Sequence, residues 1–312
     1  MKYEKEFTVA LAGNPNVGKS TVFNALTGLK QHTGNWVGKT VGNAAGSYTY
    51  NNNKYLITDL PGTYSLCAHS AEEIIACRHI CLEKPDVTVI VCDASCLERN
   101  LNLVLQITEI TSKAVLCVNM MDEAEKKNIK TDITKLSQQL GIPVAATSAR
   151  SKKGLDKLMQ AIESVALSKE SNDITLVYTS RIENAISQLL PLTEKIETDS
   201  RTKRFICLKL LQGDSDTVDS LCKKYGTDEN YLKALISAAD RLTENKFTDE
   251  IISCIFITAE GIAAECVKRS ADKKQVRDRK IDRILTGKLT GIPIMLLMLF
   301  IILWITITGA NY

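Results

Sequence analysis

The sequence predicts an α/β domain with a mainly parallel sheet, then a small all-helical domain and a C-terminal apolar helix. Strand-like and helix-like segments alternate through roughly the first half of the chain. Helical periodicity then dominates, with one short strand-like run at 175–178, and the last 19 residues before Asn311 carry no charge. The expected boundaries are 1–168 for the α/β domain, 172–268 for the helical domain, 269–291 for a basic linker and 292–310 for the apolar helix.

The first domain alternates apolar strands with amphipathic helices. Strands are expected at Phe7–Ala12, Lys54–Thr58, Val87–Cys92, Ala114–Val118 and Ile142–Ala146. Helices are expected at Ala71–Leu82, Leu97–Thr111, Ile133–Leu140 and Leu155–Ala166, with a further helix beginning near Lys19. This alternation places helices on both faces of a parallel sheet, and Asn51–Asn53 is typical of a hairpin turn.

The C-terminal third predicts helices and a membrane segment. Apolar residues recur at helical spacing in three stripes, within 182–190, 232–242 and 252–266. The stretch 273–288 then holds seven Lys or Arg against two Asp. The uncharged segment 292–310 would span roughly 28 Å as a helix, which predicts a transmembrane helix. The basic cluster before it places residues 1–291 in the cytoplasm.

Composition excludes several classes of protein. The net charge of +3 is too small to indicate nucleic-acid binding, and the N-terminus does not resemble a secretory signal. The ten cysteines lie at scattered spacings, which indicates reduced thiols in a cytosolic domain. Cys77, His79 and Cys81 lie close together but do not form a paired metal-binding framework, so we expect no metal site there.

A phosphate-binding loop is predicted at Gly13–Ser20, GNPNVGKS, between a strand and a helix. Its glycines allow backbone N–H groups to wrap phosphates, Lys19 reaches the β and γ phosphates, and Ser20 offers a hydroxyl to Mg²⁺. We expect the nucleotide to contact Gly13, Asn14, Pro15, Asn16, Val17, Gly18, Lys19, Ser20 and Thr21.

Two later motifs complete a magnesium and γ-phosphate site. Asp59-x-x-Gly62 follows a strand, so Asp59 can hold Mg²⁺ through water while the Gly62 N–H senses the γ-phosphate. The polar stretch between the phosphate loop and Asp59 should supply a threonine that ligates Mg²⁺, and Thr33 and Thr40 both qualify. Trp36 in the same stretch is expected to be exposed.

The base of the nucleotide is predicted to be guanine. In Asn119-x-x-Asp122 the carboxylate can accept hydrogen bonds from guanine N1–H and its 2-amino group, which adenine lacks. Such a site rejects adenine nucleotides by about 10⁴-fold, because its buried carboxylate would be left unpaired. Met120 lies within this motif. Ser148 and Ala149 follow the next strand, and the Ala149 N–H is a candidate donor to guanine O6.

Together GNPNVGKS, NWVGKTVG, DLPGTYSL, NMMD and DRILTGKLTGIPI resemble the FeoB family of bacterial ferrous-iron transporters. The resemblance implies a Ras-like P-loop GTPase domain, a helical domain that influences nucleotide release, and a polytopic inner-membrane domain that carries Fe²⁺. It favours Thr40 as the switch threonine and implies that Asn16 helps to hold K⁺. The implied catalytic set is Asn16, Lys19, Thr40 and Gly62.

The resemblance also implies partners and a rate. Thr63 stands where Ras-like proteins carry a water-orienting glutamine, so intrinsic turnover should be slow. The ligands would be GTP or GDP, Mg²⁺ and K⁺, and small cytosolic Feo accessory proteins are implied as partners. Because the chain stops after one expected span, we expect it to be truncated before the permease.

Two other functions compete with a GTPase that regulates an Fe²⁺ permease. The chain could be a membrane-tethered G-protein module that recruits partners without a role in transport. A G protein of ribosome or tRNA maturation is a further alternative, but the apolar C-terminus and the lack of a basic RNA-binding domain argue against it.

Overall fold

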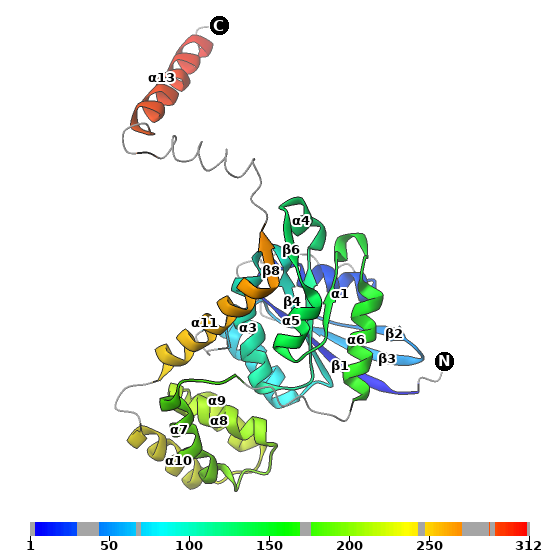
Figure 1. Ribbon diagram of the computed structural model, residues 1–312, viewed down its shortest axis with the longest axis vertical. Coiled ribbons are helices and arrows are strands. Elements are labelled where there is room, and N and C mark those ends of the chain that lie inside the picture. Colours follow the sequence, from blue (N-terminus) through cyan, green and yellow to red (C-terminus); the bar gives the residue numbers. More distant parts are fainter. Residues whose placement is uncertain are drawn as a thin grey trace. The chain divides into compact units, whose positions relative to one another are not determined.

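The structure is a computed structural model that describes residues 4–29, 44–66, 70–168, 176–242, 247–269, 287 and 291–310. The chain divides into two compact units, Met1–Lys268 and Arg269–Tyr312. The first unit contains the α/β domain and the helical domain, and the second contains one described helix (Figure 1).

A six-stranded sheet forms the centre of the α/β domain, in the order β2-β3-β1-β4-β5-β7. Only the edge strand β2 runs antiparallel, paired with β3, so the expectation of a mainly parallel sheet is confirmed. The strands are β1 (Glu6–Gly13), β2 (Ala44–Tyr50), β3 (Asn53–Asp59), β4 (Val87–Asp93), β5 (Ala114–Asn119) and β7 (Val144–Ala146).

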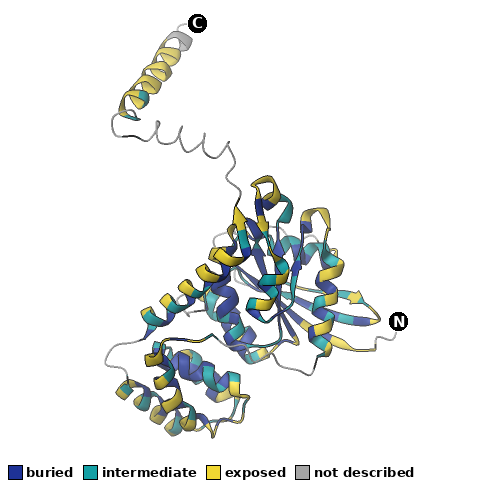
Figure 2. Cartoon of the chain, in the orientation of Figure 1, coloured by how far each residue is buried: buried dark blue, intermediate teal, exposed yellow. Residues whose placement is uncertain are grey.

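Helices cover both faces of this sheet, because successive strand residues point to opposite sides. One face packs against α1 (Lys19–Thr27) and α6 (Leu155–Leu167). The other face packs against α2 (Ala71–Arg78), α3 (Leu97–Ile110) and α5 (Ile133–Leu140), and this core continues into the helical domain. Figure 2 shows the central strands as the buried middle layer between these helices.

Short elements complete the domain. They are the π-helix η1 (His79–Glu83), the 3₁₀ helices η2 (Ala94–Cys96) and η3 (Ala149–Ser151), the helix α4 (Met121–Lys126) and the strand β6 (Ile129–Thr131). The expected hairpin turn is present between β2 and β3, where Asn51 and Asn52 both have positive φ, at 46° and 60°. Asparagine tolerates this left-handed conformation, which suits a two-residue hairpin loop.

Three predicted elements differ from the structure. The helix expected at Ala71–Leu82 ends at Arg78 and continues as η1. The strand expected at Ile142–Ala146 begins only at Val144; Pro143 lacks an N–H, and its carbonyl accepts from the Leu116 N–H at 2.9 Å.

The strand-like run at 175–178 does not form a strand over its described part, 176–178. Its backbone amides bond to side chains instead of to a neighbouring strand. The Leu176 N–H donates to Glu109 Oε1 at 2.7 Å, and the Tyr178 N–H donates to Glu183 Oε1 at 3.0 Å.

The helical domain comprises α7 (Ser180–Leu189), η4 (Leu190–Thr193), α8 (Ser200–Gln212), α9 (Ser215–Lys224), α10 (Glu229–Leu242) and α11 (Thr248–Cys266). Two of its helices, α8 and α9, begin at acidic caps: Asp199 accepts from the Thr202 N–H, and Asp214 from the Thr217 N–H. The Gly213 C-cap, at φ 72°, ends α8 and turns the chain into α9.

The end of α11 returns to the α/β domain. The strand β8 (Val267–Arg269) pairs with β6, and the Asp132 N–H donates to the Cys266 carbonyl at 2.8 Å. Beside it the Glu265 carboxylate bonds to Lys135 at 2.9 Å and to Gln139 at 2.7 Å. The helical domain is thus attached at its C-terminal end as well as through its buried core.

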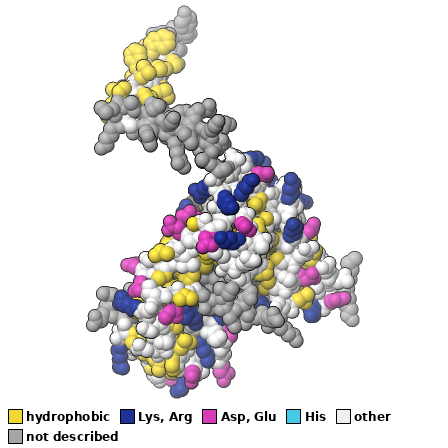
Figure 3. Space-filling view, viewed as in Figure 1, with side chains coloured by type: hydrophobic (Ala, Val, Ile, Leu, Met, Phe, Trp, Pro, Cys, Tyr) yellow, Lys and Arg dark blue, Asp and Glu magenta, His cyan; other side chains and the backbone are white. Residues whose placement is uncertain are grey.

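The second unit contains α13 (Gly291–Ala310), whose 20 residues include no charged side chain. Its large apolar side chains form a continuous exposed surface in Figure 3. Among the described residues, no helix is both long enough and apolar enough to span a membrane; in α13 the described side chains end at residue 307. Most of the expected basic linker 269–291 lies outside the described residues.

Candidate nucleotide site

Four of the predicted motifs meet at one edge of the sheet. The strand β1 ends at Gly13, β3 at Asp59, β5 at Asn119 and β7 at Ala146. Because β1, β3, β4, β5 and β7 are parallel, these carboxyl ends share one side of the domain, where open α/β sheets bind their ligands.

The loop after β1 has the backbone of a phosphate-binding loop. Asn16 and Gly18 adopt left-handed conformations at φ 66° and 81°, and α1 begins at Lys19. A Cβ added to Gly13 would lie 2.5 Å from the Val91 carbonyl oxygen, so no other residue fits where β1 leaves the sheet. The start of α1 therefore presents unpaired N–H groups and its positive dipole end to an anion.

Lys19, Ser20 and Asp59 form one polar cluster. The Lys19 ammonium contacts Asp59 Oδ1 and the Leu60 carbonyl, and Ser20 Oγ donates to Asp59 Oδ2 at 3.0 Å. The hydroxyl and the carboxylate expected to serve Mg²⁺ are therefore adjacent, and both are oxygen donors of the kind that Mg²⁺ prefers. Among the described residues, no group of three or more His, Cys, Asp or Glu side chains forms a separate metal site.

Asn119 joins two loops of the site to the end of β5. Its Nδ2 donates to the Val17 carbonyl at 3.1 Å, while its Oδ1 accepts from the Ala149 N–H at 3.0 Å and from Thr147 Oγ1 at 3.1 Å. Its side chain is almost fully buried, so all three bonds are shielded from water. The phosphate loop and the loop after β7 are thus fixed to the end of β5 by one carboxamide.

Gly18 allows the phosphate loop to lie close to the Asn119 side chain. A Cβ at Gly18 would lie 2.5 Å from Asn119 Nδ2, and the positive φ already disfavours any other residue. The glycine of the phosphate loop therefore serves the base-binding motif as well as the phosphates.

The predicted base-binding residues lie together, with one difference. The Asp122 N–H donates to Ser148 Oγ at 3.2 Å, and the Met120 backbone is left-handed at φ 60°, which turns the chain into α4. The Ala149 N–H, predicted to reach guanine O6, donates to Asn119 in this conformation. To bind a base, the Ala149 N–H would have to share its hydrogen bond between Asn119 Oδ1 and the base.

The segment after Asp59 lies on the phosphate loop. The Thr63 N–H donates to the Gly13 carbonyl at 3.2 Å, and a Cβ at Gly62 would lie 3.3 Å from Pro15. Thr63 is buried, and its hydroxyl donates to the Ser65 carbonyl. The segment that follows Asp59 therefore contacts the phosphate loop at Gly13 and Pro15.

Two further features lie beside this segment. Tyr64 is 47% exposed, and the Arg99 guanidinium lies 4.5 Å from the centre of its ring. Asn14 is only 2% exposed, and neither of its side-chain polar atoms has a hydrogen-bond partner among the described residues.

Thr33, Thr40 and Trp36 lie outside the described residues. Thr21 lies in the first turn of α1, and Asn16 is exposed on the phosphate loop.

Nine of the ten cysteines are described and all nine are free thiols. Cys77 and Cys81 are buried with their sulfurs 3.7 Å apart.

Sequence reasoning missed contacts of three residues that support the site. Asn119 was assigned to the base motif without its bonds to the phosphate loop. Gln106 and Lys209 bind the backbone of Leu66, at the end of the segment that follows Asp59. Neither residue belongs to a motif, and no sequence pattern links them to position 66.

Taken together, the parallel sheet, the phosphate loop and the motif order define a Ras-like P-loop G domain with an appended helical domain. Residues 7–162 match the family model of Ferrous iron transport protein B, and residues 178–268 match that of the FeoB cytosolic helical domain. The chain belongs to the FeoB family.

Relatives and solved structures agree with this assignment. The chain is 33% identical to the Fe(2+) transporter FeoB of Escherichia coli K12 over 316 residues, which cover 98% of this chain and 39% of that protein. It is similar to the cytosolic domain of T. maritima FeoB in apo form, with a TM-score of 0.67 and 32% identity over 84% of this chain and all of the other. A variant of S. thermophilus NFeoB bound to GDP·AlF4− gives a TM-score of 0.68 at 31% identity, covering 82% of this chain and 99% of that one.

Proposed function

We propose that this chain binds GTP and hydrolyses it to GDP and phosphate, as the cytoplasmic switch of a ferrous-iron transporter. The observation that carries the proposal is the Asn119 carboxamide, which joins the phosphate loop at Val17 to the loop of Ala149. One site then contains both the phosphate-binding Lys19 and the base-binding Asp122. Solved relatives that are named as bound to GDP, GMPPNP and GDP·AlF4− support the same ligand class.

Each residue of the site has a chemical task. Lys19 would exchange its contacts with Asp59 and Leu60 for the β and γ phosphates, and the start of α1 would stabilise their charge. Ser20 and Asp59, with Thr40 as the resemblance implies, would hold Mg²⁺, which neutralises phosphate charge when bound. The Gly62 N–H would contact the γ-phosphate, because its residue already packs against Pro15.

We also propose that turnover is slow and that K⁺ accelerates it. The Thr63 hydroxyl donates to the Ser65 carbonyl and is therefore not available to orient a water. Asn16 is exposed on the phosphate loop, and its carboxamide oxygen is a hard donor suited to an alkali cation. A positive charge beside the phosphates would act as an arginine finger does in other GTPases.

The second unit is proposed to attach the chain to the bacterial inner membrane. From Met295 to Ile305 every side chain is apolar and at least 40% exposed. Contact with lipid would remove this apolar surface from water. The chain spans about two fifths of the length of its FeoB relatives, so iron transport and accessory partners belong to the proposed context of the whole protein.

The guanine assignment is tested by Asp122→Asn, compared with Glu123→Gln on the same helix. The amide should accept xanthine nucleotides, whose 2-position carries an oxygen, and should lose about 10⁴-fold in GTP affinity. Binding constants for GTP and XTP measure this exchange. An Asp122→Asn variant with unchanged GTP affinity would show that another residue reads the base.

The competing function is a membrane-tethered module that uses bound nucleotide only to recruit partners. Release of phosphate from GTP by the full chain separates the two functions. Tight GTP binding without any turnover, in K⁺ or Na⁺, would favour the binding module.

A further inference from the structure

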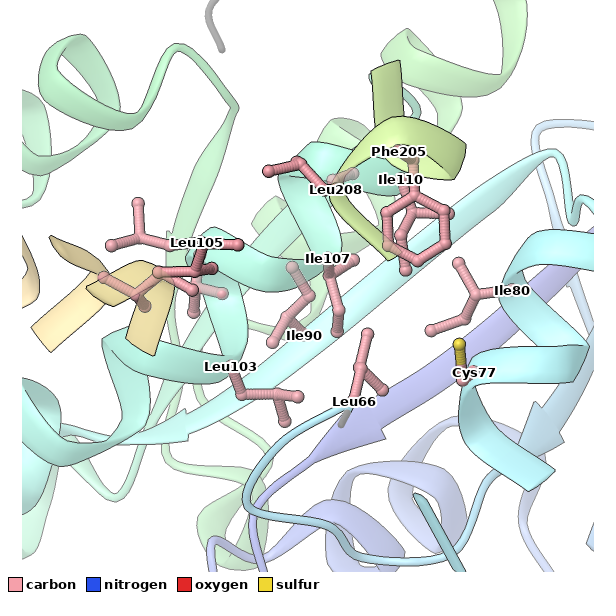
Figure 4. Packing of buried hydrophobic residues seen from close by; sticks show 14 of the residues in the cluster. Leu66, Cys77, Ile80, Ile90, Leu103, Leu105, Ile107, Ile110, Phe205 and Leu208 are labelled. Atoms are coloured by element: carbon pink, nitrogen blue, oxygen red, sulfur yellow. The ribbon is translucent and has the colours of Figure 1, made fainter. Parts of the chain in front are cut away.

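Both backbone polar groups of Leu66 are bound by side chains from different domains. The N–H donates to Gln106 Oε1 on α3 at 2.7 Å, and the carbonyl accepts from Lys209 Nζ on α8 at 2.8 Å. The Leu66 side chain is 2% exposed and packs in the core beside Cys77, Ile80 and Ile107 (Figure 4). The position of Leu66 is therefore fixed by the G domain and the helical domain together.

Lys209 is a buried charge whose partners explain its position. Only 3% of the residue is exposed, and the ammonium lies 3.2 Å from Asp214 Oδ2 and 5.5 Å from the centre of the Phe205 ring. A buried ammonium is costly unless its N–H donors are used. One N–H of the Lys209 ammonium donates to the Leu66 carbonyl, which belongs to the G domain. This hydrogen bond therefore depends on the relative placement of α8 and the Leu66 backbone.

Leu66 ends the segment that a nucleotide would disturb. At the start of this segment Lys19 binds Asp59 and the Leu60 carbonyl, and in the middle Thr63 binds the Gly13 carbonyl. A phosphate bound by Lys19 competes with Asp59 and Leu60 for three N–H donors. Only five residues separate Leu60 from Leu66, so a shift at one end readily reaches the other.

We propose that Lys209 is a positioning residue that restrains this segment, and so couples the helical domain to the γ-phosphate. The proposal rests on the proposed GTP-binding function. A triphosphate draws the Gly62 N–H toward its γ-phosphate and strains the Leu66 anchor, whereas a diphosphate makes no such demand. Loss of the anchor should therefore favour the triphosphate over the diphosphate.

The test is Lys209→Met in the full chain, with the dissociation constants of GDP and GMPPNP measured separately. A hydrogen bond to a charged group corresponds to roughly tenfold or more in an equilibrium constant. We expect the ratio of the GDP constant to the GMPPNP constant to rise about tenfold. Lys209→Arg, which keeps the charge and the donors, should keep the ratio near that of the wild type.

Lys224→Met is the matched control. Lys224 also reaches from the helical domain to a carbonyl of the G domain, that of Leu82, which lies outside the segment 59–66. Its loss should leave the ratio unchanged. Gln106→Leu removes the other bond to the Leu66 backbone and should raise the ratio, which keeps the proposal testable if Lys209→Met does not fold.

The outcomes are distinct. A raised ratio in every one of Lys209→Met and Gln106→Leu that folds, with no rise in Lys224→Met, supports the coupling. An unchanged or lowered ratio in a folded Lys209→Met or Gln106→Leu protein overturns it. Wild-type chain that binds neither GDP nor GMPPNP would refute the proposed function instead.

Discussion

Removal of the Asn119 carboxamide should separate the loops of the nucleotide site. Asn119→Ala deletes three hydrogen bonds, to Val17, Thr147 and Ala149, from a residue that is 2% exposed. Each such bond contributes about 1 kcal/mol net, and a buried partner left unpaired costs about 1–3 kcal/mol. The substitution would leave the Val17 carbonyl and the Ala149 N–H without a hydrogen-bond partner. We therefore expect it to destabilise the paired arrangement of the two loops by about 3–5 kcal/mol.

This loss should appear chiefly as weaker nucleotide binding, because the phosphate loop and the base loop would no longer be held at a fixed separation. A loss of about 3 kcal/mol corresponds to a fall of roughly 10²-fold in GDP affinity, which isothermal titration measures directly. GTP affinity should fall by a similar factor, because the carboxamide contacts neither Gly62 nor Leu66.

Asn102→Ala provides the matched control. Asn102 is also a buried asparagine, 6% exposed, but among the described residues its Nδ2 donates within α3, to the Arg99 carbonyl at 3.2 Å. It should alter thermal stability with little change in GDP affinity. The reasoning fails if folded Asn119→Ala binds GDP within threefold of the wild type, or if Asn102→Ala weakens binding as strongly.

Three further predictions concern the domain contact, the cation and the membrane. Burial acts to raise the pKa of Asp199, but Lys84 and the Thr202 N–H and hydroxyl outweigh it and hold that pKa well below its usual range. Its stabilising effect is therefore complete above about pH 4, the value in the unfolded chain, and is lost as pH falls further. Asp199→Ser, which keeps a helix cap, should lose less stability than the wild type in thermal melts between about pH 5 and pH 3. GTP hydrolysis should be faster in K⁺ than in Na⁺ at equal ionic strength, and Asn16→Ala should abolish that difference; equal wild-type rates would exclude a selective ion site. The full chain should float with liposomes in a density gradient while a chain ending at Lys268 stays behind, and a full chain that stays behind too would contradict a membrane role for α13.

The sequence predicts the parts of the site that are local. Gly13–Ser20 and Asn119–Asp122 are each continuous motifs, and the parallel order of the strands brings their ends together. The close pairing of Ser20 with Asp59 follows from that arrangement, since β1 and β3 are neighbours in the sheet.

The remaining contacts join positions that are distant in sequence and carry no pattern. Lys209 and Leu66 lie 143 positions apart, and the lysine lies within a continuously buried stretch of α8. The strand expected at 175–178 shows the same limitation. Its β-branched and aromatic residues favour a strand, but Glu109 and Glu183 take the amides that a sheet would need.

The two halves of the site differ in what a nucleotide can change. The base half is fixed by Asn119, whose buried hydrogen bonds are made to other protein groups and would not involve a phosphate. In the phosphate half, Lys19 binds Asp59 and Leu60 with the same ammonium that a phosphate would bind. Variants of the first half should therefore weaken GDP and GTP alike, whereas variants at Gln106 or Lys209 should change their ratio. A G domain can then adjust its switching through the helical domain without losing its affinity for guanine nucleotides.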